Sequence, residues 1–471
     1  MGRIGELRRS SPLALLVGVA AASVGVIYGY DLSNIAGALL FIERDFGLSA
    51  AQQEMVATAT VIGEIGGALA GGWLANAIGR KRSMVAVALG YAVFAVAGAA
   101  STSVSTLTVA RLLLGVTIGV SVVVAPVFVA ESAPARARGA LLVTYGVATV
   151  IGIIAGYLAA YLLAGAGNWR AMLGLAAVPA VLVAVLLAPI PDTARWYLQK
   201  GRVDDARRIL RRIEPGADAQ RELDEIARTL REEASGGVGV LREMLRPPYL
   251  RATLFVVTLG FFIQITGINA IVYYSPRLFE KMGFEGDFAL LILPALVQVA
   301  ALAAMLVSLA IIDRVGRRPI LLSGIATMVA ANVLLIAVFS GGEVFGEAAS
   351  AVKFAGVLLF TVGYTFGFGS LVWVYAGESL PARMRAMGAS AMLTSDLVAN
   401  ALVVAVFLTM LTSLGGAVTF AVFGVMALLS LAFVYRYAPE TKGRQLEDIR
   451  HFWENGGRWP EKEIGSVEAP A

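Results

Sequence analysis

Long apolar stretches recur along the whole chain, and polar segments separate them. A stretch of 18 or more mainly apolar residues is long enough to cross the hydrocarbon core of a bilayer as an α-helix. Twelve such stretches predict an all-α membrane protein with twelve transmembrane helices. The expected spans are 13–42, 52–77, 83–101, 106–130, 138–163, 171–190, 250–280, 288–312, 319–340, 352–378, 384–412 and 416–438.

One polar segment, 191–249, is much longer than the others and separates six predicted spans from the next six. Apolar residues recur in it at helical spacing, which predicts two or three short amphipathic helices under the membrane domain. They are Ala206, Ile209, Leu210 and Ile213 on one face, and Leu223, Ile226, Ala227 and Leu230 on another. We therefore expect an N-terminal six-helix bundle at 1–190, a cytoplasmic helical linker at 191–249, a C-terminal six-helix bundle at 250–438 and a cytoplasmic tail at 439–471.

Basic residues are distributed unevenly between the two sides of the predicted membrane domain. With the N-terminus in the cytoplasm, 32 of the 38 Lys and Arg residues fall in inner segments and 5 in outer loops, while Arg111 lies inside a span. Cytoplasmic loops tend to carry positive charge, so both termini are expected in the cytoplasm. The N-terminus resembles a signal peptide, but its apolar run continues past Asp31 and is interpreted as the first transmembrane helix.

Composition supports this class and excludes several kinds of chemistry. The 471 residues are 58% hydrophobic and 15% charged, whereas soluble proteins have about 25% charged residues. The chain has no cysteine, which excludes disulfides, thiolate metal sites and cysteine nucleophiles. Its single histidine, His451, lies in the C-terminal tail, and its net charge of +5 is spread over loops without forming a nucleic-acid-binding patch. We expect no cofactor, no metal and no enzymatic activity.

The two halves of the chain repeat one another. The sequence ESAPARAR at Glu131–Arg138 returns as ESLPARMR at Glu378–Arg385, and the glycine and basic residues at 79–82 return at 316–318. Each pair follows the same number of predicted spans in its half. Such a parallel repeat is typical of transporters that hold their solute between the halves.

The segment 261–276 carries a group of polar residues inside a predicted span. Gly267 and Pro276 give its backbone two places to depart from a straight helix. An unpaired polar group in hydrocarbon costs several kcal/mol, so the group should face protein, water or ligand. We interpret it as part of a binding site, with hydrogen bonding between helices as the alternative. The polar residues are Gln264, Thr266, Asn269, Tyr273, Tyr274 and Ser275.

Four ionisable residues lie at membrane depth. Asp31 and Arg111 both lie toward the outer half of their predicted helices, so they could meet. An ionisable residue inside a membrane is a functional candidate. We expect Asp31 to take up a proton from outside and release it inside, helped by Arg111; a static ion pair is the alternative. Glu64 and Asp396 could bind a cationic solute, carry a second proton or bond a neighbouring helix.

The repeated ESxPARxR segments fall at the cytoplasmic ends of predicted helices. Glu131 and Arg138 of the first copy can pair with Arg385 and Glu378 of the second, across the two halves. We expect an inner gate whose pairs form when the solute site faces outward and break when it faces inward. A role only in setting topology is the alternative. Four further charged residues lie nearby: Arg80, Arg317, Asp192 and Glu440.

Taken together, these motifs resemble the sugar porter family of the major facilitator superfamily over essentially the whole chain. The matching segments are Gly29–Asp31, Gly79–Arg82, Arg111–Gly115, Pro126–Glu131, Arg138–Gly139, Pro191–Trp196, Gln264–Pro276, Asp313–Pro319, Trp373–Arg385 and Pro439–Gly443. The resemblance implies a major facilitator fold and solute transport by alternating access. It also implies proton coupling, because the family's proton symporters resemble this chain in having Asp at position 31, where its facilitators typically have Asn.

The resemblance indicates which side chains would hold a solute. Sugars are neutral and rich in hydroxyl groups, so their sites use amide side chains and aromatic faces. Six residues provide such groups, with helix packing as the alternative for each: Gln264, Asn269, Asn400, Tyr28, Tyr273 and Trp373.

Several positions depart from the family pattern. The helix-7 glutamine pair is reduced to Ile263-Gln264, and the expected Asn-Gln pair on helix 5 is Tyr145-Gly146. An expected Asn on helix 8 aligns near Ala301, and Asp396 stands where a bacterial xylose–proton symporter has Gln. These departures leave the identity of the solute open.

We therefore expect a proton-coupled symporter of a sugar or sugar-like polyol. The alternatives are an uncoupled facilitator, a symporter of a non-sugar solute and a membrane sensor with a transporter fold. The expected partners are the solute, a proton and the lipid bilayer, with the chain functional as a monomer in a bacterial plasma (inner) membrane.

Overall fold

The prediction of twelve membrane-spanning helices is confirmed. The computed structural model describes residues 12–132, 138–213, 218–380, 384–444 and 446–459. These residues form helices and no strands, and twelve of the helices are long and apolar enough to cross a membrane. Each observed span overlaps the one predicted for it, with ends that differ by a few residues.

The N-terminal bundle contains six spans, and the last of them is interrupted. Its helices are α2 (Pro12–Phe46), α3 (Ala50–Ile78), α4 (Arg80–Ala99), α5 (Val104–Ser132), α6 (Arg138–Ala164), α7 (Trp169–Leu175) and α8 (Ala177–Leu187). The break between α7 and α8 at Ala176 was not predicted. Pro179 follows it, and a proline has no backbone N–H with which to continue the ladder of helical hydrogen bonds.

The C-terminal bundle also contains six spans, several of which are built from more than one helix. Its elements are α12 (Leu250–Ile265), α13 (Ile268–Lys281), η1 (Phe288–Ile292), α14 (Leu293–Val315), α15 (Arg317–Ser340), α16 (Gly342–Phe345), η2 (Gly346–Ala348), α17 (Ala349–Tyr364), η3 (Thr365–Gly369), α18 (Ser370–Ser379), α19 (Arg385–Ser413) and α20 (Gly415–Tyr437). The π-helical turn η3 lies among the glycines of the tenth span, and such turns often mark functional sites.

Three linker helices join the bundles: α9 (Ala194–Gln199), α10 (Val203–Ile213) and α11 (Ala219–Met244). The predicted apolar face of α10 is buried, as expected. The prediction of short helices is wrong for α11, which has 26 residues. The described part of the tail forms α21 (Leu446–Glu454), which packs on the C-terminal bundle, where the rings of Trp453 and Phe255 lie 5.5 Å apart.

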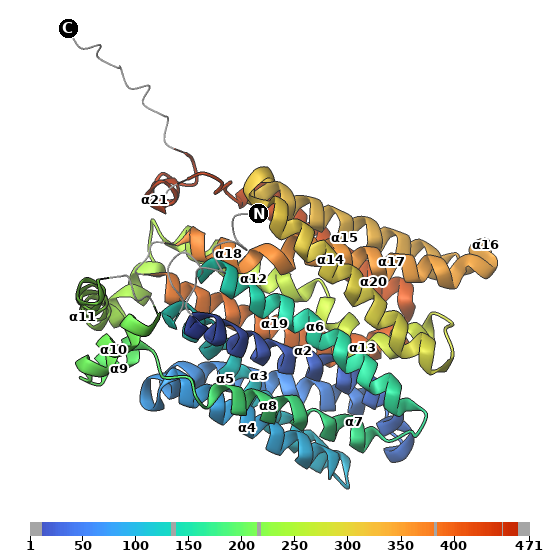
Figure 1. Ribbon diagram of the computed structural model, residues 1–471. Helices are drawn as coiled ribbons and strands as arrows, with labels where there is room; N and C mark the ends of the chain where they lie inside the picture. Colours follow the sequence, from blue (N-terminus) through green and yellow to red (C-terminus); the bar gives the residue numbers. More distant parts are fainter. Residues whose placement is uncertain (1–11, 133–137, 214–217, 381–383, 445, 460–471) are drawn as a thin grey trace.

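The two bundles lie side by side, and the linker helices lie beyond one end of them, at the left in Figure 1. We call this end the linker end, and the opposite end, where α2 joins α3, the loop end. The interface between the bundles is called the seam. Contacts across it come mainly from α3 with α19, α6 with α14, and α2 with α13.

Glycines allow the helices inside the N-terminal bundle to touch through their backbones. A Cβ atom on Gly67 would lie 2.1 Å from the carbonyl oxygen of Val116, and one on Gly119 would lie 2.0 Å from that of Glu64. Between α2 and α6, a Cβ on Gly152 would lie 2.2 Å from the carbonyl oxygen of Val26. Small residues at such positions let helices associate by close packing where the surrounding lipid is equally apolar.

Gly67→Ala tests this packing against its neighbour Gly66→Ala on the same helix. The first substitution forces α3 and α5 apart and should destabilise the protein by about 1–3 kcal/mol, as overpacking does. The second places its methyl group in open space, and alanine favours a helix more than glycine does. Thermal unfolding of both variants in detergent should therefore show a lower melting temperature only for Gly67→Ala. Equal melting temperatures would contradict the close packing.

Candidate functional site

The seventh span is broken at the position predicted from its glycine. Gly267 separates α12 from α13 with a φ of 101°, a left-handed conformation that side chains rarely adopt. A Cβ there would also lie 2.8 Å from the ring of Phe423. A second departure occurs at Tyr274, two residues before Pro276, where φ is −119° and ψ is 18°. The first break places Gln264 at the end of one helix and Asn269 at the start of the next.

The polar residues of this span divide into two groups. Thr266 and Ser275 donate to carbonyl groups of their own segment, at 3.1 and 2.7 Å. Tyr274 donates to the carbonyl oxygen of Val404 on α19 at 2.9 Å. Hydrogen bonding within the bundle therefore accounts for these three residues, so they leave the group interpreted as a binding site.

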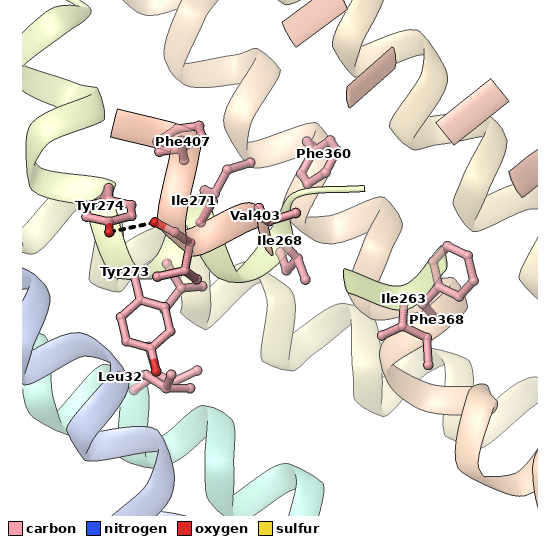
Figure 2. Close-up of a cluster of buried hydrophobic side chains, with 14 of the residues drawn as sticks. Leu32, Ile263, Ile268, Ile271, Tyr273, Tyr274, Phe360, Phe368, Val403 and Phe407 are labelled. Atoms are coloured by element: carbon pink, nitrogen blue, oxygen red, sulfur yellow. Dashed lines mark hydrogen bonds between the residues drawn. The ribbon is translucent and has the colours of Figure 1, made fainter. Parts of the chain in front are cut away.

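Tyr273 points in the opposite direction from Tyr274. Figure 2 shows its side chain extending across the seam toward Leu32 of α2, in the other bundle. Tyr273 is completely buried, and its hydroxyl group has no hydrogen-bond partner among the described residues. A buried hydroxyl without a partner is costly, which makes Tyr273 a candidate for contact with a ligand or water.

Asp31 and Arg111 form a buried ion pair inside the N-terminal bundle. Arg111 donates from Nη1 to Oδ1 of Asp31 at 2.6 Å and from Nη2 to Oδ2 at 2.9 Å. The hydroxyl group of Tyr91 donates to the same carboxylate at 3.3 Å. The structure therefore brings together the two residues expected to meet, in the bidentate geometry that fixes both groups most firmly.

Gln264, Asp396 and Asn400 face the seam from the C-terminal bundle. Asp396 and Asn400 lie one turn apart on the same face of α19, and Gln264 interacts with the carboxyl group of Asp396. Both amide atoms of Asn400 and the amide oxygen of Gln264 are buried and have no partner within the described part of the chain. These two amides are thus available to a ligand that carries hydroxyl groups.

Glu64 lies on the opposite side of the seam, in the middle of α3. Its side chain is 0% exposed, and neither carboxyl oxygen has a hydrogen-bond partner among the residues described. The hydroxyl groups of Tyr28, Tyr145 and Tyr273 lie close enough for the charge of Glu64 to act on them. This acid therefore belongs to the polar group at the seam, although the sequence left its role open.

The remaining predicted solute-binding residues are less enclosed. Tyr28 and Asn269 are partly buried. The side chain of Trp373, on α18, is 51% exposed, so it lies outside the buried polar group in this conformation. Its role in solute binding stays a prediction.

Polar contacts cross the seam at the loop end, and the sequence analysis missed them. Arg277 of α13 pairs with Glu43 of α2 at 2.5 Å and donates to Gln53 of α3 at 3.3 Å. Glu54 accepts hydrogen bonds from the backbone N–H and the hydroxyl group of Thr409, at 2.7 and 2.6 Å. The only signal in the sequence was the presence of charged residues at the ends of predicted spans.

At the linker end the charged motif residues bond within their own bundle. Glu131 pairs with Arg80 at 3.0 Å and with Arg195 at 3.5 Å, and it accepts a hydrogen bond from the hydroxyl group of Thr193 at 2.6 Å. Asp192 accepts a hydrogen bond from the backbone N–H of Arg80 at 2.9 Å, which caps the start of α4.

The C-terminal bundle repeats this arrangement. Glu378 pairs with Arg317 at 3.5 Å and accepts a hydrogen bond from the hydroxyl group of Thr441 at 2.5 Å. Glu440 accepts hydrogen bonds from the backbone N–H groups of Arg317 and Arg318, at 3.1 Å each, at the start of α15. Thr193 and Thr441 were missed as a pair, although Pro-Asp-Thr at 191–193 and Pro-Glu-Thr at 439–441 are a visible repeat.

The predicted pair between Glu131 and Arg385 is not formed in this conformation. Glu131 is occupied by Arg80 of its own bundle and by Arg195 of the linker helix α9, and two buried N–H groups of Arg385 have no partner among the described residues. The side chain of Arg138 lies outside the described residues, so its predicted pair with Glu378 is not observed. Among the described side chains, the motif glutamates of the linker end are already held by nearer arginines, whereas at the loop end polar contacts cross the seam.

Comparisons with known proteins agree with this architecture. The model of the family described as "Sugar (and other) transporter" matches residues 17–453. The chain is 33% identical over 460 residues to the galactose-proton symporter of Escherichia coli K12, covering 98% of each chain. It is 32% identical to the arabinose-proton symporter of the same strain, covering 94% of each, and 33% identical to the probable polyol transporter 4 of Arabidopsis thaliana, covering 94% of this chain and 85% of the relative.

Solved structures with a similar fold include the xylose transporter XylE from E. coli in a partially occluded inward-open conformation. The TM-score is 0.79 at 24% identity, covering 92% of this chain and all of that one. With the family model matching most of the sequence, the chain belongs to the Sugar (and other) transporter family and has the fold of the major facilitator superfamily.

Proposed function

We propose that this protein is a secondary active transporter that couples the entry of a sugar or polyol to the entry of a proton by alternating access. The observation that carries the proposal is the buried, bidentate Asp31–Arg111 pair beside the seam. Two similar relatives are proton symporters of galactose and arabinose by name, and a third is a probable polyol transporter.

Protonation of Asp31 provides the coupling step. A proton on the carboxylate removes its charge, and the attraction that holds Arg111 is lost. Breaking a buried ion pair costs about 3–5 kcal/mol, which is enough to change the balance between two conformations. Asp31 therefore binds its proton in the conformation in which Arg111 has moved away, and Arg111 displaces the proton when it returns.

The solute occupies the seam between Gln264 and Asn400 on one side and the N-terminal bundle on the other. Both amides have unused hydrogen-bonding atoms, which suits the hydroxyl groups of a neutral solute. Tyr273 adds a hydroxyl group and an aromatic edge from the break of the seventh span. Asn269, Tyr28 and Trp373 complete the site when the bundles rock around the solute.

Alternating access requires one end of the seam to open while the other is closed. In this structure Arg277 and Glu54 bond the loop end across the seam, and the motif charges of the linker end bond within their own bundles. We assign the linker end to the cytoplasm because the sequence assigns 32 of the 38 basic residues to the loops and termini of that side. Opening the loop end then frees Glu131 and Glu378 to pair with Arg385 and Arg138 across the seam.

An uncoupled facilitator, a symporter of a non-sugar solute and a sensor are the competing functions. A facilitator has no need of a buried titratable acid paired with a buried cation. This chain has such a pair in Asp31 and Arg111. The protein works as a monomer in a bacterial plasma membrane with both termini in the cytoplasm, since each twelve-helix chain contains a complete seam.

Asp31→Asn separates coupled from uncoupled transport. The amide keeps the shape of the side chain but cannot carry the proton, so uphill accumulation should be lost while exchange of solute continues. At 100 mV a one-proton symporter can accumulate its solute about fifty-fold, because the potential supplies about 2.3 kcal/mol per charge. In proteoliposomes, accumulation should fall from that range to about one-fold.

Asp287→Asn is the matched control, because it changes an exposed acid directly before η1, at the start of the eighth span. It should leave both accumulation and exchange unchanged. Intact accumulation in Asp31→Asn would remove Asp31 from the coupling step. Loss of exchange as well would assign Asp31 a structural role.

Cross-linking tests the movement of the loop end. The chain has no cysteine, so thiol reagents react only with introduced residues. In the double variant Glu54→Cys, Thr409→Cys, a short cleavable cross-linker should join α3 to α19 and stop transport, and a reductant should restore it. The two single variants, treated in the same way, should keep transporting. Continued transport in the cross-linked double variant would show that the loop end does not need to open.

A further inference from the structure

Two acids at the seam are left unused by the proposed coupling step. Arg111 holds Asp31 through Nη1 and Nη2, and neither Glu64 nor Asp396 forms an ion pair among the described residues. The side chains of Glu64 and Asp396 are 0% and 6% exposed. Two buried carboxylates without a cation cost several kcal/mol each, so each needs a proton or a positively charged ligand.

The three acids lie at successive depths between the loop end and the linker end. Along α5, Arg111 holds Asp31, and Glu64 lies against a later part of the same helix. The carbonyl oxygen of Glu64 lies against Gly119, and its neighbour Gly63 lies against the carbonyl oxygen of Leu112. Glu64 is thus level with residues 112–119, about 2–12 Å closer to the linker end than Arg111.

Asp396 lies further still in the same direction. Glu54 and Thr409 meet at the loop end, where α3 and α19 run side by side in opposite directions. From that contact Glu64 is ten residues along α3, and Asp396 is thirteen residues along α19. At 1.5 Å per residue, Asp396 lies about 5 Å closer to the linker end than Glu64.

Hydroxyl groups lie near these acids. Tyr273 extends across the seam toward α2. Its hydroxyl group has no partner among the described residues and lies close enough to Glu64 and Asp31 for their charges to act on it. Tyr28 lies close enough to Glu64 and Asp396 for their charges to act on its hydroxyl group. A hydroxyl group both donates and accepts hydrogen bonds, so it can pass a proton from one acid to the next.

The groups around each acid come from several helices. Those facing Glu64 are Asp31 and Tyr28 on α2, Arg111 on α5, Tyr145 on α6, Tyr273 on α13 and Asp396 on α19. Those facing Asp396 are Tyr28 on α2, Gln264 on α12, Tyr364 on α17 and Glu64 on α3. Arg111 is the single cation among them.

We propose that Glu64 and Asp396 continue the proton path from the Asp31–Arg111 pair toward the linker end. When Arg111 returns to Asp31, Asp396 releases its proton at the linker end, and the O–H bond on Glu64 breaks as one forms on Asp396. The proton of the Asp31 carboxyl then leaves it and forms a new O–H bond on Glu64. Charge balances at every step, because each acid becomes neutral as the preceding one becomes ionised. The inference rests on the proposed proton-coupled transport.

A cationic solute is the competing occupant of these acids, and the burial of Glu64 argues against it. An ammonium group needs space beside the carboxylate that binds it, whereas a proton occupies no volume of its own. The carboxyl group of Glu64 is completely enclosed by protein. A proton satisfies it without any rearrangement of the helices.

Glu64→Gln and Asp396→Asn test the path in proteoliposomes with a neutral sugar transported by the unaltered protein. Each amide keeps the size of its side chain but cannot carry a proton between acids. Uphill accumulation should fall from about fifty-fold toward one-fold, and the sugar-dependent alkalinisation of the outer medium, followed with a pH dye, should disappear. Counterflow exchange should stay within about twofold of that of the unaltered protein. Asp287→Asn serves again as the unaffected control.

Intact accumulation and alkalinisation in both amide variants would overturn the inference, and so would loss of neutral-sugar exchange. Selective loss of exchange of an amino sugar would overturn it too, and would identify the acids as a cation-binding site. Glu64→Asp keeps a carboxyl group and should retain alkalinisation even if Glu64→Gln fails to fold; its failure to do so while exchange continues would contradict the path. If the unaltered protein itself does not accumulate sugar against a gradient, it is the proposed function that fails.

Discussion

The structure depends on one constraint, which is that a polar group surrounded by hydrocarbon must find a partner. Inside each bundle many polar groups meet it: Asp31 holds Arg111 and Tyr91, and Tyr274 donates to Val404. Others do not, such as the amide oxygen of Asn332 inside the C-terminal bundle. Unused hydrogen-bonding atoms also remain on Glu64, Gln264, Asn400 and Tyr273. In the proposed cycle these four residues lie where a solute, water or a proton reaches them.

Rigidity within the bundles makes this concentration of polar groups useful. The glycine contacts between α3 and α5 leave no space for the helices to shift, so Glu64 and the Arg111 pair keep a constant separation as the bundle moves. The seventh span, in contrast, is broken at Gly267, which adopts a conformation that only glycine tolerates well. In the proposed cycle, a close-packed frame beside this broken span transmits a change at Asp31 to the proposed solute site.

The charged motifs at the linker end act in two ways. Asp192 and Glu440 cap helices, and Glu131 and Glu378 hold arginines within one bundle, so both copies stabilise their own half. In the proposed cycle, the same glutamates exchange those arginines for partners in the other half when the seam closes there. Individual ion pairs near the surface contribute little, about 0–1 kcal/mol. Exchange among several of them lets the two states stay within a few kcal/mol of each other, as a transport cycle requires.

Several features of this protein follow from the order of residues alone. The length of the apolar runs determines the number of spans, because the thickness of the bilayer sets the length of a helix that crosses it. The repeated motifs reveal the duplication of the chain. Gly267 determines the break in the seventh span, because the backbone preference of glycine does not depend on distant parts of the chain. The encounter of Asp31 with Arg111 was also predictable, since each has few alternatives at membrane depth.

Tertiary structure decided which polar side chains are satisfied and which are free. Tyr273 and Tyr274 are neighbours of the same type in the sequence. Tyr274 nevertheless forms a hydrogen bond inside its bundle, whereas Tyr273 faces the seam. The cross-seam bonds of Arg277 and Glu54, and the choice of Arg80 over Arg385 as the partner of Glu131, depend on how the bundles are placed. These contacts join residues that are tens to hundreds of positions apart in the sequence. Because the contacts also change with the conformation, no local pattern in the chain can encode them.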